Sequence, residues 1–457
     1  MHFSFRRRTR ARAGRIGAIL AVIAVTAVTV STTAATQQHT GPVALHDSGF
    51  AIGRNVVPLP SSGVAHFVDD PTAKPAQSAR PTQPPRARTA APTPSPAPTP
   101  QPSAAAPAPP PGPPAREVLG FAPSWTLDTW REWRMQDLSA IAYFAVTIDG
   151  NGNTVTDDGW PAWQSQQLSD MVNAAHAAGV KVLVTVRNFD DGQMFSMLGD
   201  QTHFHTAVRT ATDLMRMRNL DGVVIDFEGS DPGLGPGFVQ YAGQVRASIH
   251  AVKPDAQLVV ATYASAASGE GGMYNVGALA QNADALFAMA YDMASANDPG
   301  HATPNAPLTG GRFNDSAVLQ QYAAAGAGPD KVILGVPYYG DKWSVSSPGP
   351  NAAITDGPAP AIYSQMLDDF GCAQSLTVHQ NDPTPWATWY SPPSGDPCGS
   401  NLGSWREVYF ETPASIGAKY DLVNRANLLG TGIWALGFDT GHGELWDTLQ
   451  SHLTPKR

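Results

Sequence analysis

The segment LDGVVIDFEG, residues 220–229, reads as a buried β-strand that ends in two carboxylates. Side chains alternate along a strand, so Asp226 and Glu228 lie on one face, roughly 6–7 Å apart along the backbone. Two acids in a partly dehydrated position do not both ionise at low cost, and one of them keeps a proton near neutral pH. A protonated acid beside a carboxylate is what cleavage of a glycosidic bond requires. The alternative is that both acids only mark a solvated strand end.

The elements that would position these acids are eight apolar runs that alternate with helical patterns from residue 117 onward. Most runs are near-continuous in Val, Ile, Leu, Ala and Phe, as is typical of strands that are covered on both faces. The runs occupy 117–125, 138–149, 181–188, 220–228, 257–264, 283–292, 331–340 and 430–439. This order predicts an α/β fold, a TIM (β/α)8 barrel over residues 116–457, whose catalytic groups lie at the carboxyl ends of its strands.

One connection, residues 341–411 between the seventh and eighth strands, is much longer than the others. A loop of about 70 residues without structure of its own would be unusual, so we expect a small inserted α+β subdomain beside the catalytic end of the barrel. It contains Cys372 and Cys398. In an oxidising compartment this pair predicts a disulfide, and two free buried thiols are the alternative.

The first 115 residues differ in composition from the rest of the chain. Residues 1–35 contain a basic region, a short apolar run and small residues, in the order of a secretory signal. If it is not cleaved, the same run would tether the chain to a membrane. Residues 36–115 predict a disordered linker rich in Pro, Ala and Thr, although 36–70 are too mixed to assign a role. We therefore expect the barrel to be extracellular or in the cell envelope.

The chain is acidic, with a formal net charge of −9. Loss of a signal with six arginines would leave about −15, a charge that argues against nucleic acid and anionic surfaces as partners. The segment from Asp149 begins like a calcium loop, but Thr154 and Trp160 stand where a glycine and a bidentate acid are needed. We expect no metal, no cofactor and a monomer.

Five segments together resemble glycoside hydrolase family 18, the chitinase and peptidoglycan-hydrolase family. DGVVIDFE resembles its DxxDxDxE signature, and AMAYD at 288–292 resembles its MxYD. KVILGVPYYG resembles its seventh-strand GxPxYG, and GTGIWALGFD its eighth strand with one tryptophan. YFETPASIGAKYDLV resembles the family's return from its inserted subdomain. The similarity runs in order over residues 117–450.

The resemblance implies a retaining reaction in which the N-acetyl group of the substrate attacks the anomeric carbon. By position, Glu228 would be the general acid and then the base. Asp226 would orient the acetamido group and stabilise the positive intermediate, and Tyr291 would donate a hydrogen bond to the acetamido oxygen. Asp292 would contact the sugar, and Trp434 would form an apolar floor beneath it.

Weaker candidates complete the predicted site. Further sugar contacts are predicted at Met289, Trp125 and Tyr339. Asp221 lies on the opposite face of its strand from the acid pair, so we expect it to hold the strand by hydrogen bonds. For Tyr291, Met289 and Trp434 the alternative is an ordinary place in the core.

The sequence departs from the family signature at Val224, where the middle aspartate would stand. Without that like charge, Asp226 should ionise more easily. We expect an exported glycosidase that cleaves β-1,4 bonds in N-acetylglucosamine polymers, either chitin-type chains or the glycan of peptidoglycan. One alternative is a sugar-binding protein without catalysis, against which the retained Glu228 argues. Another is a cell-wall scaffold in which the barrel is only a spacer.

Overall fold

The computed structural model describes residues 115–381 and 383–453. The predicted signal segment and the linker up to residue 114 lie outside them. Among the described residues, none of the helices combines the length and the hydrophobicity that crossing a membrane requires.

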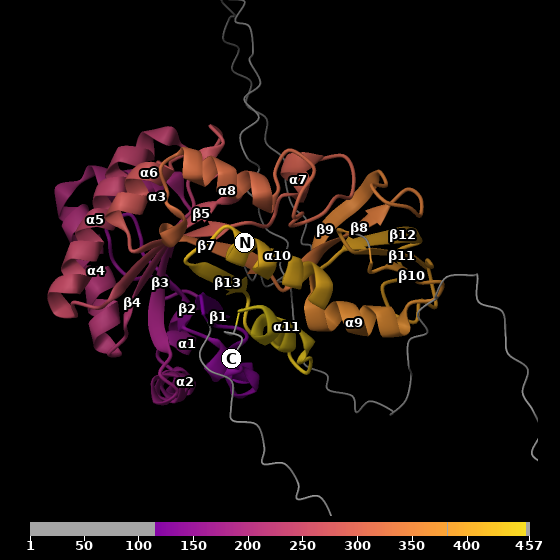
Figure 1. Ribbon diagram of the computed structural model, residues 1–457, viewed down its shortest axis with the longest axis horizontal. Coiled ribbons are helices and arrows are strands. Elements are labelled where there is room, and N and C mark those ends of the chain that lie inside the picture. The colour runs from indigo at the N-terminus through magenta and orange to yellow at the C-terminus, as the bar shows by residue number, and fades with distance from the viewer. Residues whose placement is uncertain (1–114, 382, 454–457) are drawn as a thin grey trace, which may run out of the picture.

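Eight parallel strands close into a barrel in the order β1-β13-β7-β6-β5-β4-β3-β2 (Figure 1). Each of them lies within one of the eight predicted runs, so the predicted TIM barrel is confirmed. The barrel strands are β1 (Glu117–Pro123), β2 (Ala140–Thr147), β3 (Lys181–Asn188), β4 (Gly222–Phe227), β5 (Gln257–Tyr263), β6 (Ala285–Met289), β7 (Val332–Pro337) and β13 (Gly430–Trp434).

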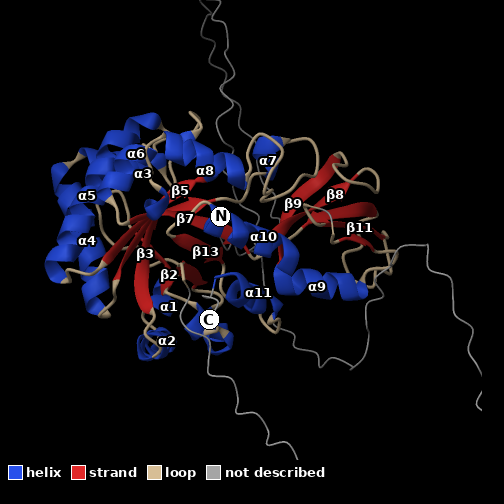
Figure 2. Cartoon of the chain, in the orientation of Figure 1, coloured by secondary structure: helices blue, strands red, loops and turns tan. Residues whose placement is uncertain are grey.

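Helices surround the barrel (Figure 2). The α-helices are α1 (Trp160–Trp163), α2 (Gln166–Ala177), α3 (Asp191–Gly199), α4 (Gln201–Met217), α5 (Gly235–Val252), α6 (Val276–Asn282), α7 (Ala294–Asn297), α8 (Asp315–Ala324), α9 (Tyr363–Cys372), α10 (Pro413–Arg425) and α11 (Glu444–Leu453). Short 3-10 turns are η1 (Leu127–Glu132), η2 (Met135–Asp137), η3 (Pro232–Leu234), η4 (Ala264–Ala267) and η5 (Pro329–Lys331).

The interior of the barrel is filled by large side chains that face glycines. Phe287 of β6 packs against Phe121 of β1, with ring centroids 4.8 Å apart. A Cβ atom on Gly432 would lie 2.5 Å from the Phe287 ring, and one on Gly335 would lie 2.7 Å from it. The two glycines are therefore needed to make room for Phe287, and the barrel centre is a packed core.

The long seventh connection forms a five-stranded antiparallel sheet of order β10-β11-β12-β8-β9. Its strands are β8 (Tyr339–Val345), β9 (Ile354–Ile362), β10 (Thr377–His379), β11 (Trp386–Ser391) and β12 (Ser404–Tyr409). The predicted subdomain between the seventh and eighth barrel strands is thus confirmed, with α9 beside the sheet and α10 leading back to the barrel (Figure 1). A disulfide joins Cys372 at the end of α9 to Cys398, with the two Cα atoms 5.3 Å apart.

Candidate active site

Asp226 and Glu228 lie at the carboxyl end of β4, as the alternation of the strand predicts. Asp226 is only 4% exposed, and its Oδ1 is buried without a hydrogen-bond partner. Glu228 follows the last residue of the strand, is partly exposed, and donates its backbone N–H to the Asn188 carbonyl of β3 (3.0 Å). The structure therefore places one dehydrated acid directly beside a second acid that solvent can reach.

Burial and mutual repulsion shift the titration of both acids. The pKa of Asp226 is raised well above its usual value, first by burial and then by the charge of Glu228. The pKa of Glu228 is also raised, mainly by burial and further by the charge of Asp292, while a hydrogen bond from Tyr263 opposes the rise. Burial and the charge of the neighbouring acid therefore make it costly for both carboxyls to ionise together.

Below the acid pair, the barrel interior is aliphatic on β4. Val224 is fully buried on the same face as Asp226. Its register partner on β3 is Thr185, whose hydroxyl is also buried and has no hydrogen-bond partner. Two polar atoms, Asp226 Oδ1 and Thr185 Oγ1, therefore lack hydrogen-bond partners on the face of the barrel that Val224 shares.

Tyr291 and Asp292 lie just beyond β6. Tyr291 is buried, and this burial raises its pKa well above the usual value. The negative charges of Asp292, Asp226 and Glu228 raise the pKa further. Tyr339 of β8 donates its hydroxyl to Asp292 Oδ1. The Asp292 side chain is exposed to water. The surrounding protein nevertheless raises the pKa of Asp292 by desolvation, and the hydrogen bond from Tyr339 lowers it. The fold thus brings the predicted residues of β4, β6 and β8 to one end of the barrel.

An aromatic cluster is formed by residues of β1, β2 and β13 and by Trp125, which follows β1. The Trp434 ring lies 4.7 Å from Phe144 and 5.5 Å from Phe121 between centroids. Trp125 packs edge-on against Phe144 at 6.1 Å. Trp434 is 7% exposed, so it belongs to the core and also reaches the surface at the end of β13. Met289 ends β6 and is partly exposed.

Sequence reasoning missed two polar residues beside the acid pair. Tyr263, at the carboxyl end of β5, hydrogen-bonds to Glu228. Arg187 of β3 is the register partner of Asp226, and its charge lowers the pKa of that acid. It is held by Asp157 (3.0 Å) and by Thr147 (2.9 Å). Both residues lie near the carboxyl end of a predicted strand, and their side chains are on its inward face. The same position in its own strand identified Asp226 as a candidate.

Asp221 lies at the opposite end of β4 from the acid pair. Its Oδ2 accepts hydrogen bonds from the Val182 backbone N–H (2.8 Å) and from His176 (2.9 Å), and Lys253 bonds to its other oxygen. Burial would raise the pKa of Asp221, but these bonds hold it below its usual value. Asp221 therefore ties β4 to β3 and to α5.

No group of three or more potential metal ligands occurs among residues 115–381 and 383–453. The Asp149 segment forms a turn in which Asp149 Oδ1 accepts the backbone N–H groups of Asn151 (2.9 Å) and Asn153 (2.8 Å). The side chain that would lead a calcium loop is thus used within the turn.

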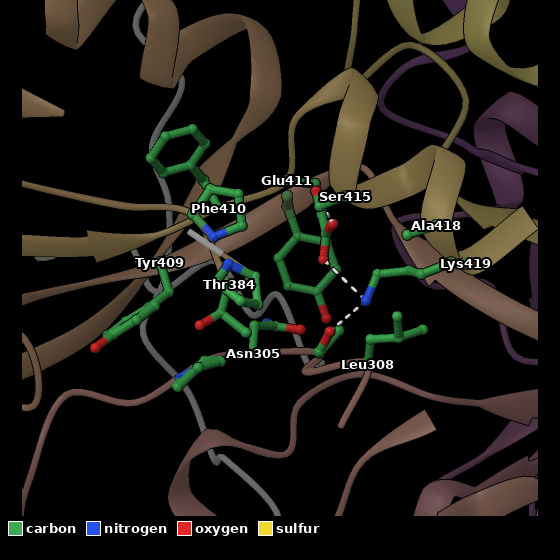
Figure 3. Close-up of a pocket in the computed structure, with 14 residues that line it drawn as sticks. Asn305, Leu308, Thr384, Tyr409, Phe410, Glu411, Ser415, Ala418 and Lys419 are labelled. Atoms are coloured by element: carbon green, nitrogen blue, oxygen red, sulfur yellow. Dashed lines mark hydrogen bonds and ion pairs between the residues drawn. The ribbon is translucent and has the colours of Figure 1, made fainter. Parts of the chain in front are cut away.

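Two cavities lie away from the acid pair. One of about 30 Å3 lies between the barrel and the inserted sheet, beside Tyr339, Asn305 and Lys419 (Figure 3). Another of about 540 Å3 lies at the opposite end of the barrel, where Glu117 and Lys181 begin their strands. Neither cavity contains the acid pair, so the assignment of the site rests on the side chains at the strand ends.

A family model, glycosyl hydrolases family 18, matches residues 117–439. Chitinase C of Streptomyces lividans is 28% identical over 32% of this chain and 23% of its own length. An endochitinase of Brugia malayi is 23% identical over 58% of this chain and 55% of its own. This chain thus spans between about a quarter and just over half of these two relatives.

Solved structures share the fold at low sequence identity. A Cycas revoluta chitinase in complex with (GlcNAc)3 is 18% identical, with a TM-score of 0.61 over 74% of this chain and 99% of that one. Human YKL-39, described as a pseudo-chitinase with retained chitooligosaccharide binding, is 17% identical, with a TM-score of 0.61 over 74% of this chain and 98% of its own. The same fold therefore occurs in a chitinase and in a pseudo-chitinase.

Proposed function

Since this chain belongs to glycosyl hydrolases family 18, we propose that it is an exported glycosidase that cleaves β-1,4 bonds in N-acetylglucosamine-containing glycans. The observation that carries the proposal is the coupled acid pair, Asp226 and Glu228, at the carboxyl end of β4. A lone acid would supply either proton transfer or charge stabilisation, whereas the pair supplies both.

The first step needs a proton on Glu228 and a negative charge on Asp226. Without substrate, Asp226 Oδ1 has no hydrogen-bond donor and the pKa of Asp226 is raised by burial, so both features favour its neutral form. The N–H of a bound acetamido group would donate a hydrogen bond to Asp226 and lower its pKa. The proton is then carried by Glu228, which donates it to the leaving glycosidic oxygen.

The acetamido carbonyl oxygen forms the new bond to the anomeric carbon as the glycosidic bond breaks. The product is an oxazolinium-type ring, and Asp226 balances its positive charge. Glu228, now a carboxylate, takes a proton from water as the water oxygen attacks the anomeric carbon and opens the ring. Two inversions at one carbon retain the β-configuration.

The remaining predicted residues fit roles in holding the sugar. Tyr291 lies close enough to both acids for their charges to act on it, and its hydroxyl would donate to the acetamido oxygen. Trp434 would offer an aromatic face to the C–H groups of the reacting sugar. Asp292, which water reaches, would accept hydrogen bonds from sugar hydroxyls.

The test is incubation of the purified protein with an N-acetylglucosamine hexamer and, in parallel, with the de-N-acetylated hexamer, followed by analysis of product mass and anomer. We expect cleavage of the acetylated chain only, with β-anomers at early times. If neither hexamer is cleaved, peptidoglycan glycan is the next substrate. Failure there too would favour the second candidate, a non-catalytic glycan-binding protein, which Val224 and the pseudo-chitinase neighbour support.

We expect Val224→Asp to move the pH profile of hydrolysis to higher pH. A carboxylate at this position adds a like charge on the face of Asp226, so the pKa of Asp226 rises. The unpartnered hydroxyl of Thr185 is in register to donate to the new side chain. Measurement of kcat/KM against pH, with Val224→Asn as the uncharged control, checks this. Identical profiles for Val224→Asp and wild type would mean that position 224 does not tune the acid pair.

A further inference from the structure

A buried ion cluster joins three segments that are far apart in the sequence. Lys419 of α10 lies 3.1 Å from Asp315 Oδ2 at the start of α8 and 3.3 Å from Glu411 Oε1 after β12. The Lys419 side chain is 3% exposed. It reaches toward Glu411 and toward the loop of Asn305 (Figure 3), where it also donates to the carbonyl oxygen of Ala306.

All three side chains of this cluster are buried: Lys419 is 3% exposed, Asp315 1% and Glu411 7%. A buried charge is costly unless it is paired, and removal of one partner leaves the others uncompensated. Burial raises the pKa of Asp315 to about 7, although the charge of Lys419 opposes the rise. Lys419 therefore holds α8, the loop at Ala306 and the end of the inserted sheet together.

The residue next to Ala306 contacts the candidate active site directly. Asn305 is 4% exposed, and its Nδ2 donates to Asp341 Oδ2 (3.1 Å) and to Asp292 Oδ1 (3.4 Å). Its Oδ1 accepts the backbone N–H of Asp292 (3.1 Å). Asp292 has a left-handed backbone (φ 57°), which costs energy for a residue with a side chain. Asn305 thus fixes both the backbone and the carboxylate of Asp292.

Both packing and polar contacts hold this loop in place: Ala306 belongs to the hydrophobic core, and the Met293 backbone N–H donates to the Asn305 carbonyl oxygen (2.9 Å). The cavity of about 30 Å3 lies beside Asn305, Ala306 and Lys419. A space of this size has room for water beside polar groups. The bond from Lys419 to the Ala306 carbonyl oxygen is one of the contacts that hold this loop beside the cavity.

We propose that Asn305 is a positioning residue for Asp292, and that Lys419 of α10 holds Asn305 in place. The inserted sheet and its return helix would then set the orientation of an acid at the carboxyl end of the barrel. This inference rests on the proposed function for its catalytic consequence, but its structural part is independent of turnover.

Ionisable groups surround Asp292 on each side. Tyr339 and Asp341 of β8 face it from the inserted sheet, Glu228 faces it from β4, and Tyr291 precedes it. The buried Asp341 has a pKa raised to about 8, by burial first and by Asp292 second, while Asn305 lowers it. The pair Asp292 and Asp341 shares one amide donor, so loss of Asn305 should raise the pKa of both acids.

The test compares Asn305→Ala with Asn297→Ala in the full-length protein. Asn297 lies in the same connection and bonds to the backbone of Phe313 and Arg312, but to no carboxylate. We expect Asn305→Ala to lower kcat/KM about tenfold or more, because misplaced substrate contacts are costly, and to change its pH profile. Asn297→Ala should lower the melting temperature and leave the profile unchanged.

A second readout does not need turnover. An acid whose pKa is about 8 in the folded protein binds its proton there more tightly than in the unfolded chain, so the free energy of unfolding falls as the pH rises from about 4 to about 8. In Asn305→Ala the free energy of unfolding should continue to fall above pH 8. In Asp341→Asn the part of this fall that comes from Asp341 should disappear. Urea unfolding at a series of pH values measures both.

These outcomes separate the two proposals. If the wild type cleaves no glycan but Asn305→Ala extends the fall in stability to higher pH, the proposed function fails and the positioning role of Asn305 stands. If Asn305→Ala and Asn297→Ala behave alike in both readouts, Asn305 is only a structural residue of the loop and the inference is wrong. A variant in which all three members of the cluster are made neutral, Lys419→Met with Asp315→Asn and Glu411→Gln, should reproduce the activity loss of Asn305→Ala while it remains folded.

Discussion

Glu228→Gln should reduce hydrolysis of an N-acetylglucosamine oligomer by about 10³-fold and leave its binding largely intact. Glutamine keeps the size and the hydrogen-bonding capacity of glutamate but cannot donate a proton to the leaving oxygen or accept one from water. The loss should therefore appear in kcat, with little change in the dissociation constant measured by calorimetry.

Glu270→Gln is the matched control for this variant. Glu270 lies in the loop after β5, at the same end of the barrel, where it is exposed and paired with Arg312. Its replacement should leave both kcat and binding unchanged. If Glu228→Gln turned over at the wild-type rate, the acid–base assignment would be wrong, and another group would have to protonate the leaving oxygen.

Asp226→Asn should lower kcat by about 10²- to 10³-fold, because it removes the charge that stabilises the positive intermediate. The same change should move the alkaline limb of the pH profile to lower pH. A neighbouring negative charge raises the pKa of an acid, so its loss lowers the pKa of Glu228, and Glu228 then loses its proton earlier as the pH rises. Kinetics across pH measure both effects.

Asp221→Asn provides the control on the same strand. Asp221 accepts bonds from Val182 and His176 at the other end of β4. Its replacement weakens partly buried hydrogen bonds and should lower the free energy of unfolding by about 1–3 kcal/mol. It should leave the pH profile where it is. A shift of the profile in Asp221→Asn as large as that in Asp226→Asn would argue against a special role for the acid pair.

The sequence alone determined the barrel and the placement of its acids. Near-continuous apolar runs predicted the eight strands, and the two-residue period of a strand put Asp226 and Glu228 on one face of β4. The seventh connection was too long to be a loop without structure of its own, which predicted a small inserted α+β subdomain. Each of these signals is local, because it depends on residues within one element or on the length between two.

The contacts around Asp292 were decided only by the tertiary structure. Asn305 reaches Asp341 across 36 residues, and Lys419 reaches Asp315 across 104. No spacing in the sequence predicts such partners, because they meet only after the barrel has closed and the inserted sheet has folded against it. The alternation of a strand tells which way a side chain points, but the charges that surround it come from segments that only the closed barrel brings together.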